Sequence, residues 1–330
     1  MTGIADIPIT ADAFFDEMLL RRAKPRLIHM LGAQEKTLPQ NQGVDSVRFR
    51  RYDKLAQNIT PLTEGTTPAG KTLGQTLITV QLNQYGDFVR IFDELAGISK
   101  EAIFAETSDL LGDQAGESLD SVTRDVIYAG TSVDFANSRV SRITVAAGDV
   151  MDIGTIRNSV QVLKDADALE FTTQGSATDQ VGTVPIRPAY WGYMHTSQRQ
   201  TFKQLTGFVE AHEYPSTVTP LIGELGEVEG VRWIETTNGE IFAAGGAAGI
   251  DVYGSLIIAQ GYHGVVNPSA AAPAPGEPAS PLGLQFIAKP FGGGGAEDPL
   301  NQRSSGGWKG NFAAVILNNA FGIRLEAALV

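Results

Sequence analysis

The feature that most constrains this chain is a pair of alternating segments joined by a polar stretch with no core of its own. Residues 44–54 place Val47 and Phe49 on one face and Arg48 and Arg50 on the other, and residues 76–92 alternate in the same way. The two segments predict an extended β-hairpin with a long exposed tip. Because a single hairpin is only marginally stable in water, it must lie on other parts of this chain or on a neighbouring molecule.

The tip of this predicted hairpin contains a formal match to a phosphate-binding loop: Gly65, four intervening residues, then Gly70-Lys71-Thr72. A working loop of this kind leaves a buried strand and opens a helix. Here the preceding residues are polar and include Pro61, and the following residues alternate as a strand. We therefore interpret Gly65, Gly70 and Lys71 as loop-tip residues, with a nucleotide-binding enzyme as the weaker alternative.

The longest predicted helix covers residues 99–129, with Ser99 as N-cap and Gly130 as the stop, although a break near Thr107 is an open alternative. An apolar stripe at 3–4 spacing predicts the buried face of this helix. An acidic stripe is predicted on the opposite face, consisting of Glu106, Asp109, Asp113, Glu117 and Asp120.

The rest of the chain predicts shorter elements. Residues 10–23 and 152–168 have the pattern of amphipathic helices, the second capped by Asp152. Short mixed elements follow from about residue 185, interrupted by a Pro/Ala-rich exposed loop at 267–283. The C-terminus predicts a hairpin with strands 312–317 and 321–328, turned at Asn318-Asn319.

Composition narrows the classes of function. The 330 residues carry a net charge of −12, which argues against a dedicated nucleic-acid binder. There are no cysteines, and the four histidines lack zinc-site spacing, so we predict no catalytic, cofactor-binding or metal-binding residues. Neither a secretory signal nor an apolar run of the roughly 20 residues that span a bilayer is found, so we expect a soluble chain made in a cytoplasm.

Five blocks of sequence, in order, resemble one family. They are LTEGTTPAGKT, LNQYGDFVRIFDEL, LLGDQAGESLDSVTRDVIYAGTSV, YMHTSQRQTFKQLTGF and GELGEVEGVRWIETTN. The chain resembles the major capsid proteins of tailed bacteriophages, in the podovirus-type (N4-like) branch. The resemblance implies an α+β chain with the HK97-like capsid fold.

The resemblance also implies a division of the chain. Residues 1–42 would be an N-terminal arm (N-arm) and residues 43–93 the extended loop (E-loop). Residues 94–184 would form a peripheral domain around the spine helix at 99–129. Residues 185–310 would form an axial domain carrying the 267–283 loop, and residues 311–330 would return to the peripheral domain.

The implied function is self-assembly into hexamers and pentamers of an icosahedral shell around double-stranded DNA, which would be touched only weakly and non-specifically. The implied partners are other copies, a separate scaffolding protein and a portal, with a cement protein left open and no membrane. The shell would belong to the virion and be assembled in the bacterial cytoplasm. A cellular nanocompartment shell of the same fold is the main alternative.

One interface between subunits is predicted from charge. The E-loop face that carries Arg48, Arg50 and Lys54, helped by Arg21, Arg22 and Arg26, would meet the acidic stripe of the next subunit. The alternative is that both faces are simply solvated, since exposed ion pairs contribute little individually.

Overall fold

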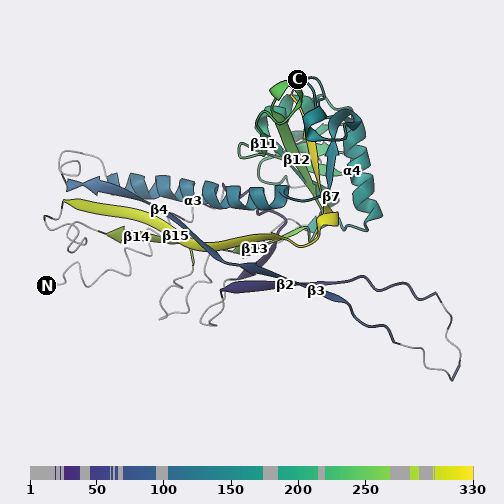
Figure 1. The fold of residues 1–330 in the computed structure, drawn as a ribbon, viewed down its shortest axis with the longest axis horizontal. Helices are drawn as coiled ribbons and strands as arrows, with labels where there is room; N and C mark the ends of the chain where they lie inside the picture. Colours follow the sequence, from purple (N-terminus) through teal and green to yellow (C-terminus); the bar gives the residue numbers. More distant parts are fainter. Residues whose placement is uncertain are drawn as a thin grey trace.

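The computed structural model describes most of the chain. The described residues are 19, 23, 26–37, 45–59, 61, 64–65, 70–93, 103–173, 185–214, 220–267, 283–289, 300 and 302–329. The predicted helix at 10–23 and the Pro/Ala-rich loop therefore lie almost entirely outside them. Figure 1 shows an elongated body, a compact lobe at one end of it and a hairpin that projects beyond both.

The body consists of one long helix lying along a sheet (Figure 1). Helix α3 (Ile103–Tyr128) is continuous through Thr107, so the alternative of a break there is wrong. In the body sheet, β4 and β14 pair antiparallel with opposite edges of β15, and β13 pairs with the later part of β15 and with β1. These strands are β1 (Gln34–Thr37), β4 (Asn83–Phe92), β13 (His263–Asn267), β14 (Gln285–Lys289) and β15 (Arg303–Ile316).

The apolar stripe predicted for the helix is its buried face. Leu111, Ala115 and Leu119 are at most 3% exposed and pack on the body sheet, partly against Trp308 and Phe312. Leu19, Ala23 and residues 26–33 lie along the same helix, and a Cβ added at Gly116 would lie 2.7 Å from the Ala23 carbonyl oxygen. Glycine at this position therefore permits the close approach of the N-terminal segment.

The predicted hairpin is shorter than its alternation indicated. Strand β2 (Ser46–Tyr52) pairs with β3 (Gln75–Gln81), but β4, which follows directly, pairs with β15 over its whole length. The single strand predicted at 76–92 was therefore wrong: it divides near Leu82 between two sheets. Phe49, only 1% exposed, packs with Val266 and Leu317, which anchors the hairpin to the body.

The lobe is built on a second sheet, which comprises nine strands of the described chain in the central order β5-β16-β12-β7-β10-β9-β8. Helix α4 (Ile153–Asp165) packs on this sheet through Ile156, Val160 and Leu163, and Asp152 caps it as predicted. Helix α5 (Arg199–Lys203) follows β7. The strands are β5 (Val133–Phe135), β6 (Phe171–Thr173), β7 (Pro185–His195), β8 (Val209–Glu210), β9 (Glu224–Val228), β10 (Val231–Thr236), β11 (Ile241–Phe242), β12 (Val252–Ile258) and β16 (Gly322–Ala327).

The C-terminal strands do not form the predicted hairpin. Strand β15 begins already at Arg303 and belongs to the body sheet, whereas β16 lies between β5 and β12 in the lobe. The chain between them crosses from one sheet to the other through a short 3-10 turn at Asn319–Phe321. Alternation alone identified both strands but could not assign their partners, because both faces of each are largely covered.

Candidate interaction surfaces

The extension of the hairpin carries exposed apolar side chains. Leu55, Ile59 and Leu73 are 52%, 88% and 60% exposed, and Figure 1 shows this segment projecting away from the body and lobe. Residues 53–59 and 70–74 form no regular strand. Large apolar side chains held this far from any core indicate a surface that another molecule covers.

The loop-tip residues do not form a phosphate site. Gly65 lies in a turn with a φ of +78°, and the coil at 70–74 leads into β3 rather than into a helix. The Lys71 ammonium donates to the backbone carbonyls of Ala56 and Gln57 across the loop. The described part of the loop therefore lacks the helix N-terminus that supplies the N–H groups of a phosphate-binding loop.

The basic face of the hairpin is present. Arg48 and Arg50 are exposed on the same face of β2, and neither has an ionic partner in the part of the chain that the structure describes. Lys54 lies beyond the end of β2, and its ammonium is 2.5 Å from the Asp167 carboxylate of the same chain. The unpaired basic face therefore consists of Arg48 and Arg50.

The acidic stripe of α3 is largely engaged within its own chain. The Arg26 guanidinium is 2.8 Å from the Glu117 carboxylate and 3.6 Å from that of Asp113. Glu106 is exposed and Asp109 is half-buried. The expected helper residue Arg26 thus contacts the stripe from the same subunit, whereas Arg21 and Arg22 lie outside the described residues.

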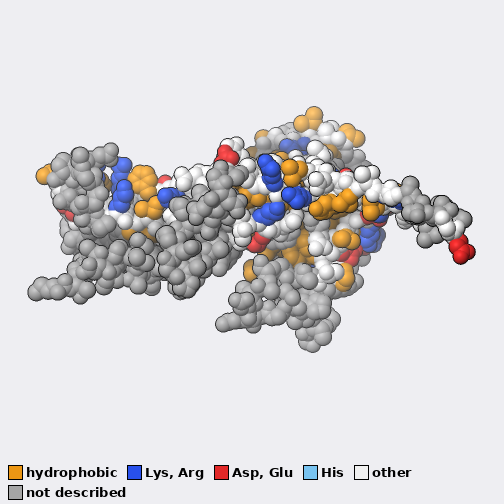
Figure 2. Space-filling view, turned by 90° about the horizontal axis from the view of Figure 1, so that it is seen from below, with side chains coloured by type: hydrophobic (Ala, Val, Ile, Leu, Met, Phe, Trp, Pro, Cys, Tyr) orange, Lys and Arg blue, Asp and Glu red, His pale blue; other side chains and the backbone are white. Residues whose placement is uncertain are grey.

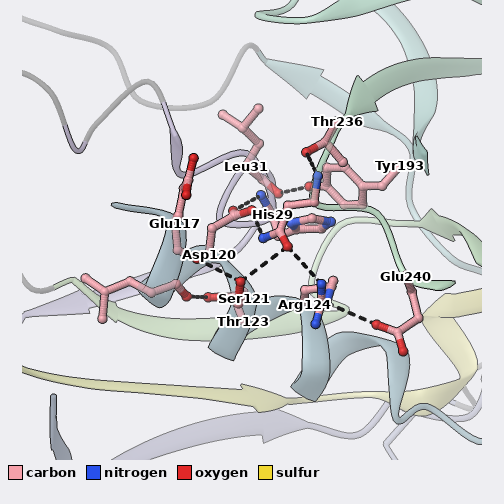
Figure 3. A network of polar contacts seen from close by, with 12 residues as sticks. His29, Leu31, Glu117, Asp120, Ser121, Thr123, Arg124, Tyr193, Thr236 and Glu240 are labelled. Atoms are coloured by element: carbon pink, nitrogen blue, oxygen red, sulfur yellow. Dashed lines mark hydrogen bonds and ion pairs between the residues drawn. The ribbon is translucent and has the colours of Figure 1, made fainter. Parts of the chain in front are cut away.

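Asp120 does not belong to an exposed stripe, and that part of the prediction was wrong. Its side chain is 1% exposed, and its carboxylate oxygens accept from the backbone N–H of His29 and contact the His29 Nδ1, both at 2.8 Å (Figure 3). The Asn238 amide also donates to it, at 2.9 Å. An acid at position 120 is explained by the buried His29 donor of the N-terminal segment, which requires an acceptor there.

This buried group joins three parts of the molecule (Figure 3). The Asn238 amide oxygen accepts from Arg124 at 2.8 Å, and Arg124 also lies 3.0 Å from the Glu240 carboxylate. The Tyr193 hydroxyl, whose pKa is raised well above its usual value by burial, donates to the Leu31 carbonyl. The network fastens the N-terminal segment to both α3 and the lobe. In the sequence, His29 and Asp120 are 91 residues apart, and no motif connects them.

A second buried histidine predicts a pH dependence of stability. Burial lowers the pKa of His263 to about 4, and its Nε2 lies 3.1 Å from the His29 carbonyl oxygen. The neutral ring is therefore favoured by folding. Its contribution is complete above the unfolded value of about 6.5 and is lost as the pH falls toward 4, at roughly 1.4 kcal/mol per pH unit.

We expect His263→Gln to flatten the decline of the free energy of unfolding between pH 6.5 and 4, as measured by urea titration at each pH. His212→Gln is the matched control, because that imidazole is 73% exposed. His29 and Asp120 lie in the same cluster but are present in both proteins. The difference between the wild-type and His263→Gln curves of unfolding free energy against pH therefore reports on His263. Parallel curves for the wild type and His263→Gln would contradict the assignment.

Two classes of site are not found. No group of histidine and carboxylate side chains that could hold a metal ion occurs among the described residues. Within the same residues, no helix is both long and apolar enough to cross a membrane.

The fold is that of capsid shells. No protein-family model matches the sequence, and no curated protein matches it either. Among solved structures, the capsid of Ralstonia phage GP4 matches with a TM-score of 0.68 at 14% identity, over 91% of this chain and 87% of that one. The head structure of Helicobacter pylori bacteriophage KHP40 matches with a TM-score of 0.62 at 12% identity, over the same shares.

The SrpI encapsulin complex from Synechococcus elongatus PCC 7942 matches with a TM-score of 0.53 at 9% identity, over 94% of this chain and 90% of that one. The chain therefore has the α+β, HK97-like capsid fold that the sequence resemblance implied. Its placement in the podovirus-type branch stays a prediction.

Proposed function

We propose that this chain is the major capsid protein of a tailed bacteriophage, which assembles into hexamers and pentamers of an icosahedral shell around double-stranded DNA. The observation that carries the proposal is the likeness to phage capsid chains over nine-tenths of the length. The exposed apolar hairpin extension supports it independently, because such a surface is explained by a neighbouring subunit.

The proposed division of the chain needs two changes. The N-arm remains residues 1–42 and the E-loop 43–93, although β4 within the latter range is paired into the body. Helix α4, which packs on the lobe sheet, and β5, β6 and β16, which belong to it, go to the axial part. The boundary at 310 moves to the start of β15, because it would otherwise cut that strand, and β13 and β14 go to the peripheral part because they pair with β15.

The inter-subunit charge contact is proposed in a narrower form. Arg48 and Arg50 of one subunit would approach the exposed end of the neighbour's acidic face, at Glu106. Asp113 and Glu117 would share their charge with their own Arg26. Asp120 and Lys54 are left out because they are engaged within the chain.

Charge reversal tests this contact. We expect Arg48→Glu with Arg50→Glu to slow assembly, followed by light scattering, and to abolish its weakening by salt. Adding Glu106→Lys should restore part of the rate. The hairpin pair is the better choice for reversal because neither residue has an ion pair to lose within the described part of its own chain. Assembly that is indifferent both to the reversal and to salt would show that the two faces do not meet.

The remaining partners follow from the same proposal. A separate scaffolding protein and a portal would act during assembly in the bacterial cytoplasm, and a cement protein is left open. The net charge of −12 supports only weak contact with the packaged DNA, since tight binding needs many phosphate contacts. The role would be structural and not enzymatic; incubation with nucleotide and Mg²⁺ should give no turnover.

A nanocompartment shell is the second candidate, favoured by the likeness to the encapsulin chain. One experiment separates the two: the protein is expressed with the genes encoded beside it, and the particles are imaged by electron microscopy and analysed for contents. Closed shells holding nuclease-protected DNA are expected. Shells that hold an enzyme instead would support the nanocompartment, and a monomer at every concentration would contradict both.

A further inference from the structure

The face of the body sheet that turns away from α3 carries a row of exposed apolar groups. Alternation sends Phe286 and Trp308 toward the helix and leaves their neighbours on the open face. There Phe88, Gly307 and Ile287 stand side by side across β4, β15 and β14. Phe88 is 56% exposed and Ile287 is 38% exposed.

The missing side chain of Gly307 hollows this face. A Cβ added at Gly307 would lie 2.7 Å from the Phe88 Cβ and 2.8 Å from the Asp87 carbonyl oxygen. The result is a groove of about 570 Å³, with Gly307 at its floor and both apolar and basic side chains in its lining. The floor is well supported, because Trp308 beneath it packs against α3 and donates to Gln114 at 3.2 Å.

The groove is strongly cationic for a chain with a net charge of −12. Its lining includes four basic side chains and a single acidic residue, Asp87, whose carboxylate already accepts from Gln114 and from a backbone N–H. Figure 2 shows blue and orange side chains gathered together toward one end of this face. The basic side chains are Arg90, Lys289, Arg303 and Lys309.

Three of these cations lack a carboxylate partner. Arg90 lies over the Phe88 ring at 5.2 Å, and neither it nor Lys289 and Lys309 has an ion pair in the described part of the chain. A matching ligand must therefore supply both anions and apolar groups. Duplex DNA supplies anions but no matching apolar groups. The β2–β3 hairpin of another copy would bring Arg48 and Arg50 against the like charges of the groove.

The N-terminus of this chain has the required composition. Residues 1–18 contain Asp6, Asp12, Asp16 and Glu17, no lysine or arginine, and several large apolar residues, among them Phe14 and Phe15. The next residue, Leu19, is fully buried beneath the same sheet, in a cluster with Phe286 and Trp308. The segment is thus tethered to the very strands that form the groove.

We propose that residues 1–18 fold back over the open face of their own body sheet, with their carboxylates against Arg90, Lys289 and Lys309 and their apolar groups in the groove. With residues 10–18 in the predicted helix, at about 1.5 Å per residue, and residues 1–9 extended, the segment reaches roughly 45 Å, which is ample to pass round the edge of a sheet. A short tether also gives an effective concentration in the millimolar range, so even a weak site is occupied. This inference goes beyond shell formation and holds whichever shell the chain builds.

A photo-crosslinking amino acid placed at Phe15 of the full chain tests the contact by mass spectrometry. Crosslinks are expected to residues 84–92, 285–289 or 303–309 of the same chain. Lys289→Glu with Lys309→Glu should lower their yield about tenfold, and adding Asp12→Lys with Asp16→Lys should restore it. Arg157→Glu with Lys164→Glu is the control, since it makes the same charge change on the exposed side of α4 in the lobe and should leave the yield unchanged.

Mixing isotopically labelled and unlabelled chains identifies the source of the segment. Crosslinks that join a labelled chain to an unlabelled one would overturn the fold-back and assign the segment to a neighbouring copy. Crosslinks confined to other parts of the chain, or a yield that the charge reversal does not change, would overturn the site itself. None of these results depends on whether shells form, so failure here leaves the proposed function standing.

Discussion

Alanine at position 120 is expected to lower the free energy of unfolding by about 3–5 kcal/mol. The substitution removes a carboxylate that is 1% exposed and leaves two His29 groups and the Asn238 amide without their acceptor. Each buried donor without a partner costs roughly 1–3 kcal/mol. Because these donors come from the N-terminal segment and from the lobe, the loss should loosen both parts together.

Asp125→Ala is the matched control for this loss. Asp125 is on the same helix and is also paired with an arginine, at 2.7 Å, but its side chain is 64% exposed. Its removal should change the free energy of unfolding by no more than about 1 kcal/mol. Urea denaturation gives both values, and hydrogen exchange should show faster exchange at residues 26–33 only for Asp120→Ala. If both variants lose the same free energy of unfolding, the buried network contributes no more to stability than an exposed ion pair.

Asp120 also shows what could not be predicted from the sequence. Five acids at 3–4 spacing define one helix face, and nothing local separates the member that is buried. The distinction depends on His29, which arrives from 91 residues away. The apolar stripe of α3 was predictable because it rests on a periodic local pattern, whereas the acidic stripe needed the path of the N-terminal segment.

The strands repeat this lesson at the level of sheets. The alternation at 76–92 correctly indicated extended structure, but pairing decides that β3 belongs to the hairpin and β4 to the body. The last strands were located and then wrongly paired with each other, since neighbours in sequence are the usual partners. The capsid fold itself was recognised from five sequence blocks that occur in the order of a known family. Such a resemblance includes the long-range arrangement of the elements, which hydrophobic periodicity does not report.

The exposed apolar residues of the hairpin extension could have been noticed in the sequence. Leu55, Ile59 and Leu73 stand in an otherwise polar loop, which is unusual unless another surface covers them. The interface was instead predicted from the pattern of charges, at Arg48 and Arg50. Of the two proposed contacts, the apolar one should contribute more to association, because each buried large side chain contributes more than an exposed ion pair.

Replacing Leu55, Ile59 and Leu73 together by serine is therefore expected to weaken subunit association far more than any change of charge. Burying each of these side chains contributes roughly 1.5 kcal/mol or more, so the triple variant should lose about 4–5 kcal/mol for each contact, or roughly a thousandfold in affinity. The folded subunit should keep its melting temperature, because all three side chains are more than half exposed within it. Gln57→Ser, in the same exposed segment, is the control and should assemble normally. Sedimentation over a range of protein concentrations measures the assembly of both variants. If the triple variant forms shells at the same protein concentration as the wild type, the hairpin extension is not an assembly surface. If its melting temperature falls, the three side chains stabilise their own subunit instead.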